Sequence, residues 1–312
     1  MNVLKEQPGH KPRSIRSYIG LTIRGFCMGA ADVVPGVSGG TMAFILGIYE
    51  ELLDAIRSFD LQFLRLLIRF RFKEAFIGTS WRFLMALFVG IFLAVFSLAK
   101  LLSWLLQNQP VLIWSFFFGL ILASVYTVGR HLQKWTLPVV VWMFMGTVGS
   151  YFLVGLVPLK TPDSPWFLFL SGAVAICAMI LPGISGSFIL VLLGKYAYLL
   201  EAVNNRDFLP LIVAAVGAGF GLITFVRCLN WLLRRYRDLT LAVLTGLMLG
   251  ALRKVWPWKK TLETMTDNHG NILIISQSNT LPAAWNQEVT LAVGLIIVGF
   301  FVVFVLNLRA SK

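Results

Sequence analysis

Long hydrophobic runs alternate with short polar segments along most of the chain. A helix needs about 20 apolar residues to cross the roughly 30 Å hydrocarbon core of a bilayer. Six runs are long enough, at about 83–106, 111–128, 138–157, 209–233, 239–255 and 289–308. They lack the strict alternation of transmembrane β-strands. The pattern therefore predicts an all-α polytopic membrane protein.

Two further apolar regions, 15–57 and 166–203, are each interrupted by Pro-Gly. The first contains DVVPGVSGGTMAFILGIYEE from Asp32, and the second contains LPGISGSFILVLLGKYAYLLEA from Leu181. After the first break, the uncharged run from Thr41 ends before Glu50 and gives only about 13 Å of helix at 1.5 Å per residue. We therefore expect each region to be a re-entrant hairpin that breaks at Pro-Gly and returns to the same side.

The two interrupted regions repeat each other. Aligning Pro35 with Pro182 places Gly36, Ser38, Gly39, Gly47 and Tyr49 on Gly183, Ser185, Gly186, Gly194 and Tyr196 without a gap. The sequence thus predicts two repeats, 1–160 and 161–312, each a hairpin followed by three spans. Because three crossings are an odd number, the second repeat should be inverted relative to the first.

Loop charge predicts the topology. Lys and Arg cluster in the N-terminal tail, at 57–82, 130–134 and 234–237, and at the C-terminal end. The positive-inside rule places these segments and both termini in the cytoplasm. The exceptions, which this topology puts outside, are Arg253, Lys254, Lys259 and Lys260.

Composition narrows the class further. The chain is 58% hydrophobic and 13% charged, with mean hydropathy +0.80, which no soluble domain needs. Its net charge of +13 is carried by loops between spans, so we expect contacts with anionic membrane lipids and no nucleic acid. The three cysteines lie in apolar segments without metal-ligand spacing, so we expect no metal and no cofactor. The GAGFG stretch at 217–221 lies inside a span, which favours close helix packing over nucleotide binding.

The paired motifs carry the candidate chemistry. Ser38 and Ser185 are placed to cap the returning half-helices, and a helix N-terminus, with about half a positive charge, favours an anion. Two such ends facing each other would form a cradle for a phosphate or carboxylate. Its members would be Gly36, Ser38, Gly39, Gly40 and Thr41 in the first copy, and Gly183, Ser185, Gly186 and Ser187 in the second. The alternative is that each motif merely turns the chain and packs tightly.

Charged residues beside the motifs leave further alternatives open. Arg24 would face the cavity as an anion ligand or extend toward the inner interface. Asp32 lies deep in the segment, where a carboxylate is costly unless paired or protonated, so proton coupling or a capping role is expected. Glu50 and Glu51 would take part in coupling or be solvated. Lys195 would be a second cation for the substrate or an anchor at the outer interface.

At these two motifs the sequence resembles the bacterial polyprenyl-phosphate transporter family, and the resemblance covers essentially the whole chain. It implies that undecaprenyl phosphate, the lipid carrier of cell-wall and surface-polymer synthesis, is moved from the outer to the inner leaflet of the plasma membrane for reuse. The family's motif positions correspond to Pro35 to Thr41 and Pro182 to Ser187. The sequence departs from the family at Asp32, where Asn is typical, at Lys195, where an apolar residue is commoner, and at Ala197, where the first copy has Glu50.

Several functional hypotheses follow from these residues. The chain shows no ATP-binding element, so transport would follow a gradient or be coupled to an ion, with protons the first candidate through Asp32, Glu50 and Glu51. A transporter or channel for a small soluble anion would use the same cradle. A membrane enzyme is disfavoured because no nucleophile–base set is visible, and a scaffold would leave the duplicated motif unexplained. A homodimer is compatible with the sequence.

Overall fold

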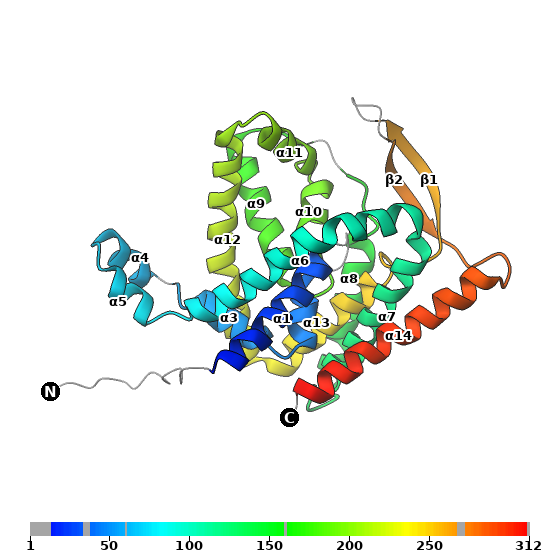
Figure 1. Cartoon of the computed structure of the whole chain (residues 1–312), viewed down its shortest axis with the longest axis horizontal. Helices are drawn as coiled ribbons and strands as arrows, with labels where there is room; N and C mark the ends of the chain where they lie inside the picture. The colour runs from blue at the N-terminus through cyan, green and yellow to red at the C-terminus, as the bar shows by residue number, and fades with distance from the viewer. Residues whose placement is uncertain (1–13, 34–37, 60, 159–160, 267–271, 311–312) are drawn as a thin grey trace.

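The computed structural model describes residues 14–33, 38–59, 61–158, 161–266 and 272–310 as a helical protein with one small β-hairpin (Figure 1). Its helices are α1 (Ile15–Asp32), α2 (Gly39–Ile45), α3 (Tyr49–Arg57), α4 (Leu61–Ile68), α5 (Phe72–Ile77), α6 (Trp81–Asn108), α7 (Pro110–Gly129), α8 (Leu137–Leu153), α9 (Pro165–Ile180), α10 (Gly186–Leu192), α11 (Tyr196–Asn204), α12 (Phe208–Arg235), α13 (Arg237–Ala251) and α14 (Gln287–Ala310). The strands are β1 (Lys259–Thr266) and β2 (Ile272–Asn279).

Four of the described helices, α6, α7, α12 and α14, are long and apolar enough to cross a membrane alone. The spans expected at 138–157 and 239–255 form the shorter helices α8 and α13, of 17 and 15 residues. At 1.5 Å per residue these are about 25 and 22 Å long. The prediction of an all-α polytopic membrane protein is confirmed.

At each motif the preceding helix ends, and the next helix packs back against it. After α1 ends at Asp32, α2 packs against α1, and α10 packs in the same way against α9. A second break follows in both copies at Gly47 and Gly194, whose φ values are 67° and 65°. Glycine adopts this left-handed conformation without the strain that a Cβ brings. The single returning helix expected in each hairpin is therefore wrong: each is two short helices, and α10 and α11 are bent by 101°.

Corresponding elements in the two halves have matching lengths. Both α2 and α10 have 7 residues, both α3 and α11 have 9, and both α6 and α12 have 28. The segment with α4 and α5 interrupts only the first half, and the β-hairpin interrupts only the second. The relative orientation of the halves stays a prediction.

The two halves interlock through glycines at helix crossings. Within each half, α1 packs on α6 and α9 packs on α12; across the halves, α7 packs on α14 and α8 on α13. A Cβ on Gly119 would lie 2.0 Å from the Ile296 carbonyl oxygen, and one on Gly246 would lie 2.1 Å from that of Met143. Small residues allow helix backbones to approach this closely in membrane proteins. Helices of one half are thus packed directly against helices of the other.

Two elements lie outside the main helical body. Helices α4 and α5 leave large apolar side chains such as Ile68 and Ile77 exposed. Strands β1 and β2 form an antiparallel pair, with Lys259 opposite Asn279. Figure 1 shows the hairpin on the opposite side of the molecule from the first residues of α1 and the last residues of α14.

The glycine contacts predict different effects for two neighbouring substitutions in α12. A Cβ on Gly217 would lie 2.0 Å from the Phe169 carbonyl oxygen, whereas a Cβ on Gly219 meets nothing within 4 Å. We expect Gly217→Ala to separate α9 from α12 and to destabilise the fold by about 1–3 kcal/mol. Gly219→Ala, the matched control, should leave stability unchanged or raise it by up to about 1 kcal/mol. Thermal unfolding in detergent measures both. Equal midpoints for the two variants would contradict the assigned packing.

Candidate functional site

The two broken segments meet and satisfy each other's backbone groups. The Ser38 hydroxyl lies 3.1 Å from the carbonyl oxygen of Met179 and 3.3 Å from that of Leu181. The Tyr49 hydroxyl donates to the Ile180 carbonyl at 3.2 Å. These carbonyls stand at the C-terminal end of α9, where a helix leaves acceptors without intrahelical partners. Residues of the first half therefore cap the helix that enters the second motif.

A residue of the second half also donates a hydrogen bond to the first half. The Gly183 amide donates to the Thr41 hydroxyl at 3.0 Å, and Ser38 and Thr41 are each only 1% exposed. Gly183 has φ 90°, and a Cβ there would lie 3.0 Å from the Met248 Cα in α13. Glycine is needed at this position both for its conformation and for the close approach of α13.

In the first motif, the N-terminus of α2 holds a carboxylate of the chain itself. The Gly39 amide donates to Asp32 Oδ1 at 2.6 Å, and the Gly40 amide donates to the Ser38 hydroxyl at 3.1 Å. The predicted cap by Ser38 is confirmed. Asp32 occupies the place where the positive end of a helix favours an anion, so the first copy is closed in this conformation.

The second motif is open by comparison. The Ser185 hydroxyl shares a hydrogen bond of 2.7 Å with the Ser187 hydroxyl and gives α10 no side-chain cap. The predicted cap by Ser185 is therefore wrong, because its hydroxyl pairs with Ser187 instead. Ser187 is exposed, and Gly186 packs tightly, with a Cβ there only 2.7 Å from the Ala175 carbonyl oxygen. The second copy thus presents the exposed Ser187, whose hydroxyl is hydrogen-bonded to that of the buried Ser185.

The remaining predicted positions lie around this centre in different settings. Arg24, in the middle of α1, is partly exposed and makes no hydrogen bond or ion pair among the described residues. Lys195 is buried, donates to the Thr161 carbonyl at 2.9 Å and forms an ion pair with Asp163. The Asp163 carboxylate balances the charge of Lys195, so this lysine is not a free cation for a bound anion.

The acidic residues after the first motif begin α3. Glu50 forms an ion pair with Arg237 at 2.9 Å, and Glu51 lies beside it in the first turn. Gly36 lies outside the described residues. Tyr49, at the start of the same helix, is buried and stacks on Phe44 with ring centroids 3.8 Å apart. Tyr49 is not among the candidate residues named from the sequence, although its pairing with Tyr196 in the repeat was a signal.

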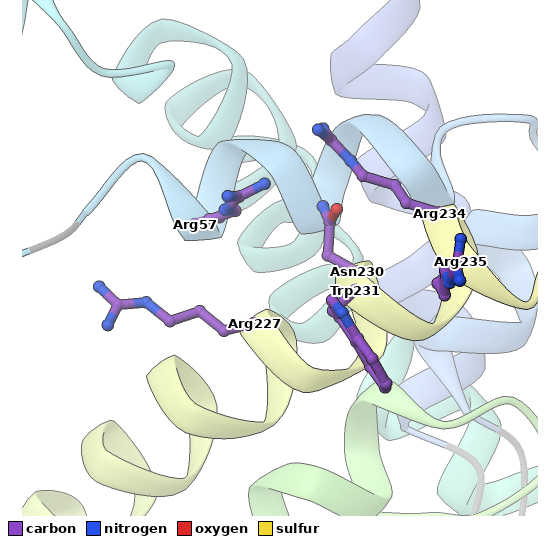
Figure 2. A pocket seen from close by; sticks show the side chains of 6 residues that line it. All are labelled: Arg57, Arg227, Asn230, Trp231, Arg234 and Arg235. Carbon is purple, nitrogen blue, oxygen red and sulfur yellow. The ribbon is translucent and has the colours of Figure 1, made fainter.

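A basic pocket lies at the far end of α3 (Figure 2). Its volume is about 590 Å³, and it is lined by Arg57, Arg227, Asn230, Trp231, Arg234 and Arg235. Asp54 accepts from Asn230 Nδ2 at 2.6 Å and from Arg234 at 3.2 Å, and so joins α3 to α12. Arg57 and Arg227 have no carboxylate partner in the described part of the chain. The pocket therefore favours an anion.

The sequence held a signal for this pocket that loop-charge reasoning did not use. Arg227 lies inside the span expected at 209–233, and Asn230, Trp231 and Arg234 follow at the spacing of one helix face. A polar stripe within a membrane span usually faces protein or a cavity. The pocket is also linked to the motifs, because α3 runs from Tyr49 to Arg57, about 13 Å at 1.5 Å per residue.

Apolar helices around two interrupted helices, with polar groups gathered at the breaks, define a helical membrane transporter. The family model of undecaprenyl phosphate translocase-like proteins matches residues 28–273. A Vibrio cholerae protein named polyprenyl-phosphate transporter is 47% identical over 85% of this chain and 86% of its own length. A Staphylococcus aureus protein of the same name is 31% identical over 75% of this chain and 85% of its own. The chain belongs to the undecaprenyl phosphate translocase-like family. No solved structure matches it.

The hydrogen bond between the motifs makes a testable contribution to stability. Thr41→Val preserves shape but leaves the buried Gly183 amide without an acceptor, which costs about 1–3 kcal/mol. Thr245→Val is the matched control, because the Thr245 hydroxyl is also buried but bonds only the Leu241 carbonyl of its own helix. Thermal unfolding in detergent should show a clear loss for Thr41→Val and a smaller one for the control. The reverse order would show that the motifs do not brace each other.

Proposed function

We propose that the protein translocates a polyprenyl phosphate, with undecaprenyl phosphate as the substrate, from the outer to the inner leaflet of the bacterial plasma membrane. The observation that carries the proposal is the meeting of the two broken segments, which gathers hydroxyl and amide groups inside an apolar helical body. Two relatives named polyprenyl-phosphate transporter support the substrate class. Both termini are cytoplasmic, and the two halves have opposite orientations.

The phosphate passes the paired motifs while the isoprenoid tail stays in lipid. The second motif receives the phosphate first, because its Ser185 and Ser187 hydroxyls are not engaged with the other half. The basic pocket at Arg57 and Arg227 receives it at the cytoplasmic end. Arginine suits this task because its planar donors match phosphate oxygens. A path with cationic and hydroxyl groups avoids the large cost of moving a bare phosphate through hydrocarbon.

Asp32 couples transport to protons in this scheme. Its carboxylate and the phosphate compete for the N-terminus of α2, where the Gly39 amide now donates to Asp32. Protonation removes the charge of Asp32 and weakens that hydrogen bond, so the α2 terminus becomes available to phosphate. A soluble-anion transporter remains the alternative function, since the same cradle would accept a small anion without a tail.

Flux measurements separate the proposed function from its alternative. The purified protein in proteoliposomes should translocate labelled undecaprenyl phosphate, and Ser187→Leu should reduce the flux at least about tenfold, because it replaces an exposed hydroxyl of the second motif by an apolar group. Ser97→Leu is the control, since Ser97 is exposed on α6 and bonds only carbonyls of its own helix. Uptake of inorganic phosphate without lipid flux would favour the soluble-anion transporter.

Asp32→Asn tests the coupling. Asparagine retains a carbonyl oxygen that can accept from the Gly39 amide, so the fold should persist, but it cannot exchange a proton. We expect an imposed pH gradient to accelerate lipid flux of the unmodified protein and to have no effect on the flux of Asp32→Asn. The measurement is the ratio of initial rates with and without the gradient. An equal ratio for the two proteins would remove Asp32 from the coupling step.

A further inference from the structure

The basic residues that violate the positive-inside pattern lie together in space. They follow α13 and begin β1, at the end of the molecule that carries the hairpin (Figure 1). Arg253 has a protein partner, since it donates to the Tyr151 carbonyl at 2.9 Å and its guanidinium lies 4.3 Å from the Tyr151 ring centroid. Lys254 and Lys259 have different surroundings, and the predicted topology does not explain why two lysines lie there.

These two lysines are partly buried among aromatic rings. Lys259 Nζ lies 4.2 Å from the ring centroid of Trp114 in α7 and donates to the Lys254 carbonyl at 2.6 Å. Lys254 Nζ lies 4.9 Å from the ring centroid of Phe188 in α10. Cation–π contacts stabilise an ammonium group but leave its charge uncompensated.

Neither ammonium group has a carboxylate partner among the described side chains. Burial, and then the charge of Lys254, lower the pKa of Lys259 to about 7. The indole N–H of Trp258 is buried next to this segment and donates to no acceptor in the described part of the chain. Buried donors without partners are rare in folded proteins. Two cations and one orphaned donor are the groups that an anion would satisfy.

The lysines also lie beside the open motif. The Cα of Met248 in α13 approaches Gly183 so closely that a Cβ there would lie 3.0 Å away, and Lys254 comes less than two helical turns later. The ring under Lys254 belongs to Phe188, the residue that follows Ser187. An anion held by Lys254 would therefore lie close to the hydroxyl groups of the second motif.

We propose that Lys254, Lys259 and the Trp258 indole form a phosphate-monoester site that captures the headgroup of the transported lipid before it reaches Ser185 and Ser187. This site deepens the proposed function and rests on it. The aromatic side chains Trp114 and Phe188 provide apolar surface for the first isoprenoid units. The site explains why lysines occur on the side that the positive-inside rule leaves poor in basic residues.

A purely structural role makes different predictions for the same residues. Lys259 donates to a carbonyl just beyond the end of α13, a contact that stabilises helix ends. If anchoring were its whole role, neutral substitutions would lower the unfolding temperature and leave anion binding unchanged. Measuring binding and unfolding on the same variants separates the two roles.

The probe is radiolabelled farnesyl phosphate, bound at equilibrium to the purified full-length protein in detergent. We expect Lys254→Gln and Lys259→Gln each to weaken binding about tenfold or more, because each removes a charged donor to phosphate. Lys260→Gln is the matched control: it removes the same charge from the neighbouring position of β1, where the side chain is exposed and alternation directs it to the opposite face. Its affinity should equal that of the unmodified protein.

A pH series adds a readout that a structural role would not change. Lys254, whose pKa burial also lowers, is the titratable group that faces Lys259; the other packed elements present Trp114 from α7 and Asn279 from β2, which do not titrate. A phosphate monoester is already a dianion above pH 7.5, since its second pKa is about 6. Between pH 7.5 and 9, binding must therefore add a proton to Lys259, and affinity should fall by up to about tenfold per pH unit. Lys259→Arg, which stays charged, should lose less affinity over this range than the unmodified protein, because only Lys254 of the pair can then titrate.

The outcomes distinguish this site from the function on which it rests. Unmodified protein without lipid flux would overturn the proposed function itself. Normal flux and unchanged farnesyl phosphate affinity in both glutamine variants would overturn the capture site alone, as would equal losses in Lys260→Gln. Inorganic phosphate that binds as tightly as farnesyl phosphate would overturn the assignment to a lipid headgroup. Lysine-dependent binding of farnesyl phosphate, with a smaller loss of affinity above pH 7.5 in Lys259→Arg than in the unmodified protein, would establish the site.

Discussion

The fold depends on one constraint: a helix that is broken inside a membrane must find partners for its freed backbone groups within the protein. An unsatisfied group in hydrocarbon costs several kcal/mol. Here the terminal carbonyls of α9 accept hydrogen bonds from Ser38 and Tyr49 of the other half. In return, the Thr41 hydroxyl accepts from the amide of Gly183. The second break is therefore stable only in the presence of the first half, and the interlocked glycine crossings hold the two halves together.

The two copies of the motif have become unequal within this shared frame. The repeat aligns Asp32 with Met179, so only the first copy has a carboxylate that can reach its own helix N-terminus. Met179 contributes a backbone carbonyl to Ser38 instead. One substitution between equivalent positions thus places a carboxylate at the helix N-terminus of the first copy and none from the equivalent position of the second.

Local signals in the sequence predicted the features that depend on few residues. Pro-Gly marked both breaks, and the gapless repeat paired the elements correctly. The second breaks at Gly47 and Gly194 were missed, although a glycine at equivalent positions in both copies indicated them. Environments set by distant contacts were not predictable. Tyr49 is buried against Ile180 whereas its counterpart Tyr196 is exposed, and this difference depends on the tertiary contacts of α3 and α11.

Whether a charged residue has a counter-charge from a distant part of the sequence was equally unpredictable. Lys195 was a candidate ligand until its ion pair with Asp163 became visible. Lys259 was an exception to the predicted topology and Arg227 lay inside an expected span. Only the fold shows that each lies near other basic groups and has no carboxylate partner among the described residues. In each case the sequence gives the charge, but the presence of a counter-charge depends on packing between separate helices.

The distribution of unbalanced charge favours a substrate with both a phosphate and an apolar tail. Basic groups without a carboxylate partner in the described part of the chain occur at the hairpin end, with Lys254 and Lys259, and at the far end of α3, with Arg57 and Arg227. Hydroxyls and amides lie between them at the motifs. Large apolar side chains are exposed on α6 and α12, as on helices that contact hydrocarbon. A lipid phosphate needs only a polar track for its headgroup, since hydrocarbon around those apolar faces accommodates its tail.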